Sequence, residues 1–167
     1  MIEWQFYPKR DQAPELLRKV ANAFEEEEQA IESERNSLSS NKVLDAVRVK
    51  LELLGFEVED RGKKKAIRVP VLFGMRGKAD KSFVVDAFHS KGMTVVEVEA
   101  GRAKTNYQFL KDMFEACMMY GVEYLVIAVR RLYRKNKDFK DIAVFLDTLY
   151  ASGRMTLPLK GIMIIGY

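Results

Sequence analysis

The stretch SFVVDAFHSKGMTVVEVEA, residues 82–100, contains two apolar runs separated by a short polar turn. Residues 82–88 and 94–100 have the length and the content of valine, threonine and phenylalanine that are typical of strands. The residues between them, His89-Ser90-Lys91-Gly92, are typical of a tight connection. The sequence therefore predicts a β-hairpin here, and the remaining elements are expected to be arranged around it.

The flanking sequence alternates between helical and strand patterns. Residues 122–129 form a near-continuous apolar run, as expected of a strand that is buried on both faces of a sheet. Helices are expected at 14–36, 41–54, 103–120 and 139–151, further strands at 56–60, 67–73 and 160–167, and a loop at 74–81. This order predicts an α/β fold with a mixed central sheet flanked by helices.

The length and composition of the chain fit one globular domain. Its 167 residues are 48% hydrophobic and 31% charged, which excludes a disordered or fibrous class. We expect a single domain, 1–167, made of an N-terminal helical extension (1–40), a core (41–130) and a C-terminal helix and strand (131–167). No apolar run is long enough to suggest a membrane span. Cys117 is the only cysteine, which favours a reducing, cytoplasmic compartment and leaves too few ligands for structural zinc.

The net charge of +4 is unevenly distributed. Residues 1–40 contain five basic and nine acidic residues, whereas residues 41–167 contain 23 basic and 15 acidic residues. A basic body suits a polyanionic partner such as nucleic acid. A solvated basic surface without such a partner is the alternative.

Three carboxylates in the hairpin are expected to share one face. Glu97 and Glu99 lie two residues apart on a strand and so project to the same side. A four-residue loop at 89–92 would pair Phe88 with Met93 and place Asp86 opposite Val95, on the face of the two glutamates. A loop of odd length would turn Asp86 to the opposite face.

Close carboxylates repel one another, and a divalent cation relieves this repulsion. Mg²⁺ prefers oxygen ligands and commonly combines one or two carboxylates with substrate phosphate oxygens. The pattern therefore favours a Mg²⁺ (or Mn²⁺) site for phosphodiester chemistry. The alternative is an amphipathic strand whose glutamates are merely solvated.

The arrangement of Asp86, ten residues, then Glu97-Val98-Glu99 resembles the PD-(D/E)xK nuclease superfamily. The order of elements expected over residues 41–130 is similar to the αβββαβ core of that restriction-endonuclease-like fold. Val85 stands where the motif has proline, and Glu99 stands where it has lysine. Glutamate in that position resembles the BamHI and BglII branch of the type II restriction endonucleases.

The resemblance implies roles for particular residues. Asp86 and Glu97 would hold the metal, and Glu99 would position or deprotonate the attacking water. Lys104 or Arg102, at the start of the next expected helix, could instead supply the missing cation. An acidic residue from the first core helix, Asp45, would complete the site, although Asp45 could equally lie on the polar helix face.

Two basic segments are candidates for nucleic-acid contact. One follows Glu99 and contains Arg102 and Lys104, at an expected helix N-terminus that could bind phosphate. The other follows the central strand, and its candidate residues are Arg130, Arg131, Tyr133, Arg134, Lys135 and Lys137. Ordinary solvated loops remain the alternative for both segments.

The sequence thus favours a Mg²⁺-dependent endonuclease that hydrolyses DNA phosphodiester bonds. Symmetric cuts in two strands would require a homodimer, and a restriction role would imply a partner methyltransferase. Two alternatives stay open. One is a catalytically inactive nuclease-fold protein that binds nucleic acid, and the other is an assembly or regulatory subunit that does not.

Overall fold

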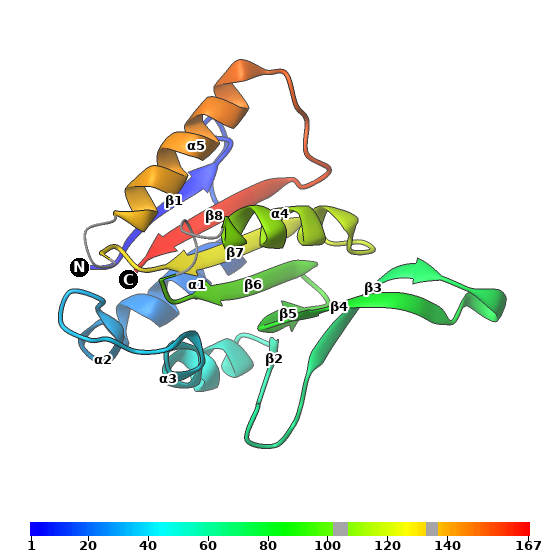
Figure 1. Cartoon of the computed structure of the whole chain (residues 1–167), viewed down its shortest axis with the longest axis horizontal. Coiled ribbons are helices and arrows are strands. Elements are labelled where there is room, and N and C mark those ends of the chain that lie inside the picture. The colour runs from blue at the N-terminus through cyan, green and yellow to red at the C-terminus, as the bar shows by residue number, and fades with distance from the viewer. Residues whose placement is uncertain (102–106, 133–136) are drawn as a thin grey trace.

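The computed structural model of the chain describes residues 1–101, 107–132 and 137–167, and its centre is a mixed six-stranded sheet (Figure 1). The strand order is β1-β8-β7-β6-β5-β2. Strands β6, β7 and β8 run parallel, and the other pairs are antiparallel. The bounds of these strands are β1 (Glu3–Tyr7), β2 (Glu57–Val58), β5 (Ala87–His89), β6 (Thr94–Glu99), β7 (Tyr124–Val129) and β8 (Gly161–Gly166). The predicted α/β class with a mixed sheet flanked by helices is confirmed.

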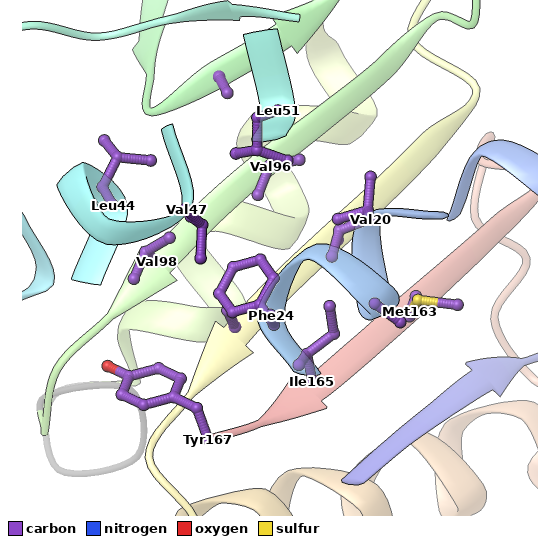
Figure 2. Close-up of a cluster of buried hydrophobic side chains, with 14 of the residues drawn as sticks. Val20, Phe24, Leu44, Val47, Leu51, Val96, Val98, Met163, Ile165 and Tyr167 are labelled. Carbon is purple, nitrogen blue, oxygen red and sulfur yellow. The ribbon is translucent and has the colours of Figure 1, made fainter. Parts of the chain in front are cut away.

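Helices cover both faces of this sheet and enclose two apolar cores. The first core contains side chains of α1 (Glu15–Glu25), α2 (Glu28–Ile31) and α3 (Ser40–Leu53), and Figure 2 shows part of it. The second contains side chains of α4 (Gln108–Met118) and α5 (Asp138–Ser152). Across the ranges that the structure describes, no helix combines the length and the apolar character needed to span a bilayer.

The alternation of side chains along β6 decides which face each residue meets. Val96 and Val98 belong to the first core, beneath α1 and α3 (Figure 2). Val95 belongs to the second core. Glu97 and Glu99 alternate with the valines and therefore lie on the side of the sheet that α4 covers.

A second, two-stranded sheet pairs β3 (Ile67–Phe73) with β4 (Ala79–Val85), joined through the 3₁₀ turn η1 (Met75–Gly77). We call this hairpin, residues 67–85, the arm, because it projects beyond the six-stranded sheet (Figure 1). Its base is held by Ile67, Val69 and Val85, which are buried in the second core. At Asp86 the chain leaves β4 and enters β5 in the main sheet.

Several sequence predictions of element bounds are wrong. The helix expected at 14–36 is interrupted between α1 and α2, within the run Glu25–Glu28, where successive like charges weaken a helix. The loop expected at 74–81 gives way to β4 at Ala79. The N-terminal extension was expected to be helical, yet β1 pairs with the buried strand β8. That strand was missed because its pairing partner lies at the other end of the chain.

The predicted register of the central hairpin is shifted by two residues. Phe88 pairs with Val95 instead of Met93, and His89 pairs with Thr94. The strand extends through His89 because its Nδ1 accepts a hydrogen bond of 2.7 Å from the Gly92 N–H and stabilises the turn. Because side chains alternate between faces with a period of two, a shift of two residues leaves each side chain on its predicted face. Asp86 precedes the Ala87–Val96 pair and therefore lies beside Glu97 instead of Val95.

Candidate active site

A polar cleft with a volume of about 180 Å³ lies where the arm, β6 and α4 meet. Its lining is dominated by charged and amide side chains, and it includes the end of β4 and the start of α3. The lining residues are Ser40, Glu59, Arg61, Val84, Val85, Asp86, Glu97, Val98, Glu99, Gln108, Lys111 and Asp112. Asp86, Glu97 and Glu99, expected from the sequence to converge, are thus brought into one cleft.

Asp86 occupies the bend between β4 and β5, where the backbone changes sheets. Its Oδ2 accepts a hydrogen bond of 2.8 Å from the Val98 N–H, and its backbone carbonyl accepts one of 2.7 Å from the Glu59 N–H. Burial raises the pKa of Asp86 to about 6, against the opposing effect of the Val98 hydrogen bond. Asp86 is therefore clamped to β6 and faces the glutamates.

The two glutamates of β6 are partly buried and electrostatically crowded. Burial and the neighbouring Asp86 and Asp112 raise the pKa of Glu97 well above its ordinary value. Burial and the neighbouring carboxyls of Asp112 and Asp86 raise the pKa of Glu99 to about 8. Among the described residues, neither glutamate has an ion pair with a cation within 4.0 Å.

Asp112 is a further carboxylate of the cleft and is only 4% exposed. Its Oδ1 accepts a hydrogen bond of 3.1 Å from Gln108 Nε2 and lies 3.7 Å from Lys111 Nζ. Its Oδ2 is buried without a hydrogen-bond partner among the described residues. Burial raises the pKa of Asp112 to about 6. A buried acceptor without a partner calls for an explanation, and a bound ion is one that the surrounding carboxylates would favour.

Among the described residues, Lys111 is one of two cations that line the cleft, the other being Arg61. Its Nζ lies 3.1 Å from Glu115 Oε2, and its side chain is about half exposed. Burial lowers the pKa of Lys111, but the carboxylates of Glu115, Asp112 and Glu97 together raise it by more. The resulting pKa is above the ordinary value of a lysine. Lys111 is therefore charged, close to the carboxylates, and reachable from solvent.

The donor set of the cleft suits a hard divalent cation, because it consists of carboxylates and includes the unpartnered Oδ2 of Asp112. Among the described residues, no group of three such side chains is already close enough to form a metal cage. Close, buried carboxylates repel one another, and a bound cation would relieve this repulsion. Asp86 and Glu97, with Asp112 beside them, are the residues that fit a cation.

Three other residues expected at the site or at the nucleic-acid interface have structural contacts elsewhere. Asp45 is 61% exposed on α3, pairs with Arg48 and does not line the cleft, so the structure does not bring it together with Asp86 and the glutamates. Arg130 is buried, and its guanidinium donates to the Leu38 carbonyl. Arg131 donates to the Met1 carbonyl and pairs with Glu34 at 2.8 Å. These contacts tie the end of β7 to the N-terminal region, and the predicted phosphate contacts of Arg130 and Arg131 stay predictions.

The rest of the two basic segments is only partly described. Lys137 is exposed immediately before α5. Arg102, Lys104, Tyr133, Arg134 and Lys135 lie outside the described residues, so their predicted contacts stay predictions.

The sequence predictions missed the contribution of α4 to the site. Gln108, Lys111, Asp112 and Glu115 recur at the spacing of one helix face, which forms a polar stripe within an otherwise apolar helix. This stripe could have been recognised as a face directed at Glu97 and Glu99. Glu59, which follows β2, was also missed, because nothing local indicates that it reaches the cleft.

Comparisons of this chain with protein-family models, with curated proteins and with solved structures find no match. The residues of the cleft and their chemistry therefore carry the functional argument.

The raised carboxylate pKa values predict that the metal-free protein loses stability as the pH rises. Glu99 keeps its proton in the folded chain up to about pH 8 but loses it near its ordinary pKa of 4.5 once unfolded. The folded state thus binds more protons between these values, and its stability falls as the pH rises through them. Thermal unfolding in EDTA should show a lower Tm at pH 8.5 than at pH 5.

Glu99→Gln should raise the Tm at pH 8.5 and flatten this pH dependence, because it removes a charge that burial disfavours. We expect a gain on the order of 2 kcal/mol, which corresponds to a Tm increase of about 4–8 °C in a chain of this size. The matched control, Glu123→Gln, removes an exposed glutamate paired with Lys160 and should not reproduce the gain. A Tm that rises with pH in the wild type would contradict the pKa assignments.

Proposed function

We propose that this protein is a metal-dependent endonuclease that hydrolyses phosphodiester bonds in DNA. The observation that carries the proposal is the convergence of Asp86, Glu97, Glu99 and Asp112 on one cleft, with Lys111 at its mouth. Buried, mutually repelling carboxylates destabilise a fold, so their presence together favours a functional reason. A phosphodiester and a divalent ion supply the charges that such a cleft lacks.

In this proposal each side chain has a distinct role. Asp86 and Glu97 would hold a divalent ion, and the chemistry it would supply when bound is Lewis-acid stabilisation of charge on the phosphate. The pKa of Glu99, about 8 in the metal-free chain, would fall beside a bound cation, and the ionised carboxylate would then accept a proton from the attacking water. Lys111 faces the phosphate and stabilises the developing negative charge. Lys111 thus takes the part of the lysine that Glu99 replaces in the PD-(D/E)xK motif.

The restriction-endonuclease-like assignment of the core belongs to the same proposal. It is supported by the order α3, β2, β5, β6, α4 and β7, in which the arm is inserted between β2 and β5, with Asp86 before β5 and the glutamates on β6. Cleavage of both strands of a duplex would be carried out by a homodimer, in which each copy contributes one cleft. The cytoplasm is the compartment in which we expect it to act.

The test is cleavage of supercoiled plasmid DNA by the purified protein with Mg²⁺ or Mn²⁺. We expect nicked and then linear products, and no cleavage in EDTA. Plasmids of several sequences should be used, because a sequence-specific enzyme would spare some of them. Absence of cleavage on genomic DNA of high sequence complexity, with either metal, would contradict the proposal.

A second candidate function is a nuclease-fold module that binds DNA without cutting it. Two observations favour it, namely glutamate at the lysine position and the lack of a preassembled metal cage among the described residues. Calorimetric titration with Mn²⁺ separates the two candidates. The endonuclease should bind the ion with an affinity that Asp86→Asn weakens, whereas the binding module should give no Asp86-dependent heat.

A further inference from the structure

The positive charge of this protein is concentrated in the arm and in the turn that precedes it. Residues 61–85 contain eight of the 28 basic residues but one of the 24 acidic residues. They therefore carry a net charge of +7, whereas the whole chain carries +4. Four of these cations belong to the arm, namely Arg68, Arg76, Lys78 and Lys81, and all four are exposed. The remainder of the chain is net acidic, so the field that attracts a polyanion originates here.

Among the residues that the structure describes, the exposed cations of the arm have no carboxylate partner. Within the described ranges, no ion pair joins Arg68, Arg76 or Lys78 to an acidic side chain, whereas most cations of the helices are paired. Apolar side chains near the tip are also exposed, including Leu72 and Met75, which is 92% exposed. A two-stranded ribbon with an uncovered apolar tip and free cations has the composition of a surface that binds a partner.

The arm is nevertheless held firmly against the body. Phe73 packs edge-to-face on Tyr120 with ring centroids 5.1 Å apart, and the Tyr120 N–H donates to the Pro70 carbonyl at 2.8 Å. The buried face of the base belongs to the second core. The arm therefore presents its cations in a preorganised position, which lowers the entropic cost of binding.

The outer face of the arm leads directly into the carboxylate cleft. Arg68 pairs with Val84, and both side chains point away from the core because Ile67 and Val85 occupy the opposite face. Val84 is 43% exposed and also lines the cleft. Two residues later the same chain reaches Asp86. A ligand lying along the arm would thus have its phosphates close to the carboxylates.

We propose that the arm is the duplex-DNA docking element of this protein and that it enters the major groove. This inference rests on the endonuclease proposal and names the form of its substrate. A major groove about 12 Å wide admits a two-stranded ribbon, whose strands lie about 4.8 Å apart. The deep, narrow major groove of duplex RNA does not admit one. The basic turn, Arg61 to Lys65, follows the phosphates beside the groove.

A second copy of the chain fits this surface less well. Two arms packed on each other would bring like charges together, because each arm carries four cations and a single carboxylate, Asp80. The phosphate backbone, in contrast, gains from release of counterions around every neutralised phosphate.

Binding is measured by fluorescence anisotropy in EDTA, so that it does not depend on cleavage, with labelled 30-base-pair DNA of mixed sequence. The arm variant carries Arg68→Gln, Arg76→Gln and Lys78→Gln. The control variant carries Arg10→Gln, Arg18→Gln and Arg154→Gln, which remove the same charge from exposed positions away from the arm. We expect the arm variant to bind about 10²-fold more weakly, with a salt dependence shallower by about 2.7 in slope. The control should retain wild-type binding.

The position in the groove is tested with DNA whose cytosines carry glucosylated 5-hydroxymethyl groups, which fill the major groove. Wild-type protein should bind this DNA at least tenfold more weakly than unmodified DNA and should not be displaced by netropsin, a minor-groove ligand. Duplex RNA and single-stranded DNA of equal length should bind more weakly than duplex DNA. Equal binding to modified and unmodified DNA would overturn the major-groove assignment.

The docking and endonuclease proposals fail in distinguishable ways. The docking role would be overturned if the arm and control variants lost DNA affinity equally. It would also be overturned if the arm variant changed the oligomeric state measured by light scattering. Both conclusions would hold even if the protein cleaves plasmid. Tight, arm-dependent binding to duplex DNA without any cleavage would instead retain the docking role and end the endonuclease proposal.

Discussion

Glu97→Gln should reduce metal-dependent plasmid cleavage by about 10³-fold or more. Glu97 is the central carboxylate of the cleft, between Asp86 and Asp112, and its replacement by an amide removes a charge that the proposed divalent ion requires. Glutamine has nearly the same shape, so β6 should keep its packing. The initial rate of nicking, measured at saturating Mg²⁺ and again with Mn²⁺, tests this expectation.

Two controls separate a chemical effect from a structural one. The variant should be as stable as the wild type or more so at pH 8, because it removes a buried charge with a raised pKa. Asp45→Asn provides a matched change at an exposed aspartate on α3 that does not line the cleft, and it should cleave at the wild-type rate. If Asp45→Asn and Glu97→Gln were equally impaired, the site would have to include α3 and its present boundaries would be wrong.

Lys111→Gln should lower the cleavage rate about 10²-fold while the affinity for DNA changes little. The reason is that Lys111 lines the carboxylate cleft, where negative charge would develop on the phosphate. It does not belong to the arm, which is the proposed binding surface for the duplex. Single-turnover cleavage gives the rate, and anisotropy in EDTA gives the affinity.

The matched control for Lys111 is Lys160→Gln. Lys160 also pairs with a glutamate, Glu123, at 2.8 Å, but it lies outside the cleft and should be dispensable. Lys111→Arg should recover part of the activity because it restores the charge. An unchanged cleavage rate in Lys111→Gln would show that another residue supplies the positive charge of the motif lysine, whose position Glu99 occupies. Lys104 would then be the next residue to replace.

The class of fold and the shared face of the carboxylates could be predicted from sequence because both follow from local periodicity. Side chains alternate along a strand, so Glu97 and Glu99 had to project together whatever their surroundings. A register error of two residues did not matter for Asp86, since faces repeat with that period. The apolar run of β7 likewise indicated a strand buried on both faces, and the structure places it between β6 and β8.

The cleft itself was decided by tertiary structure. Only the packing of α4 over β6 brings Lys111 and Asp112 to Glu99, and only the change of sheets at Asp86 separates the arm from the main sheet. The same long-range contacts bury Arg130 against the Leu38 carbonyl and leave Asp45 exposed beside Arg48. The physical reason is that periodicity along the chain specifies which side of an element a residue occupies. Which element covers that side depends on contacts between segments far apart in the sequence.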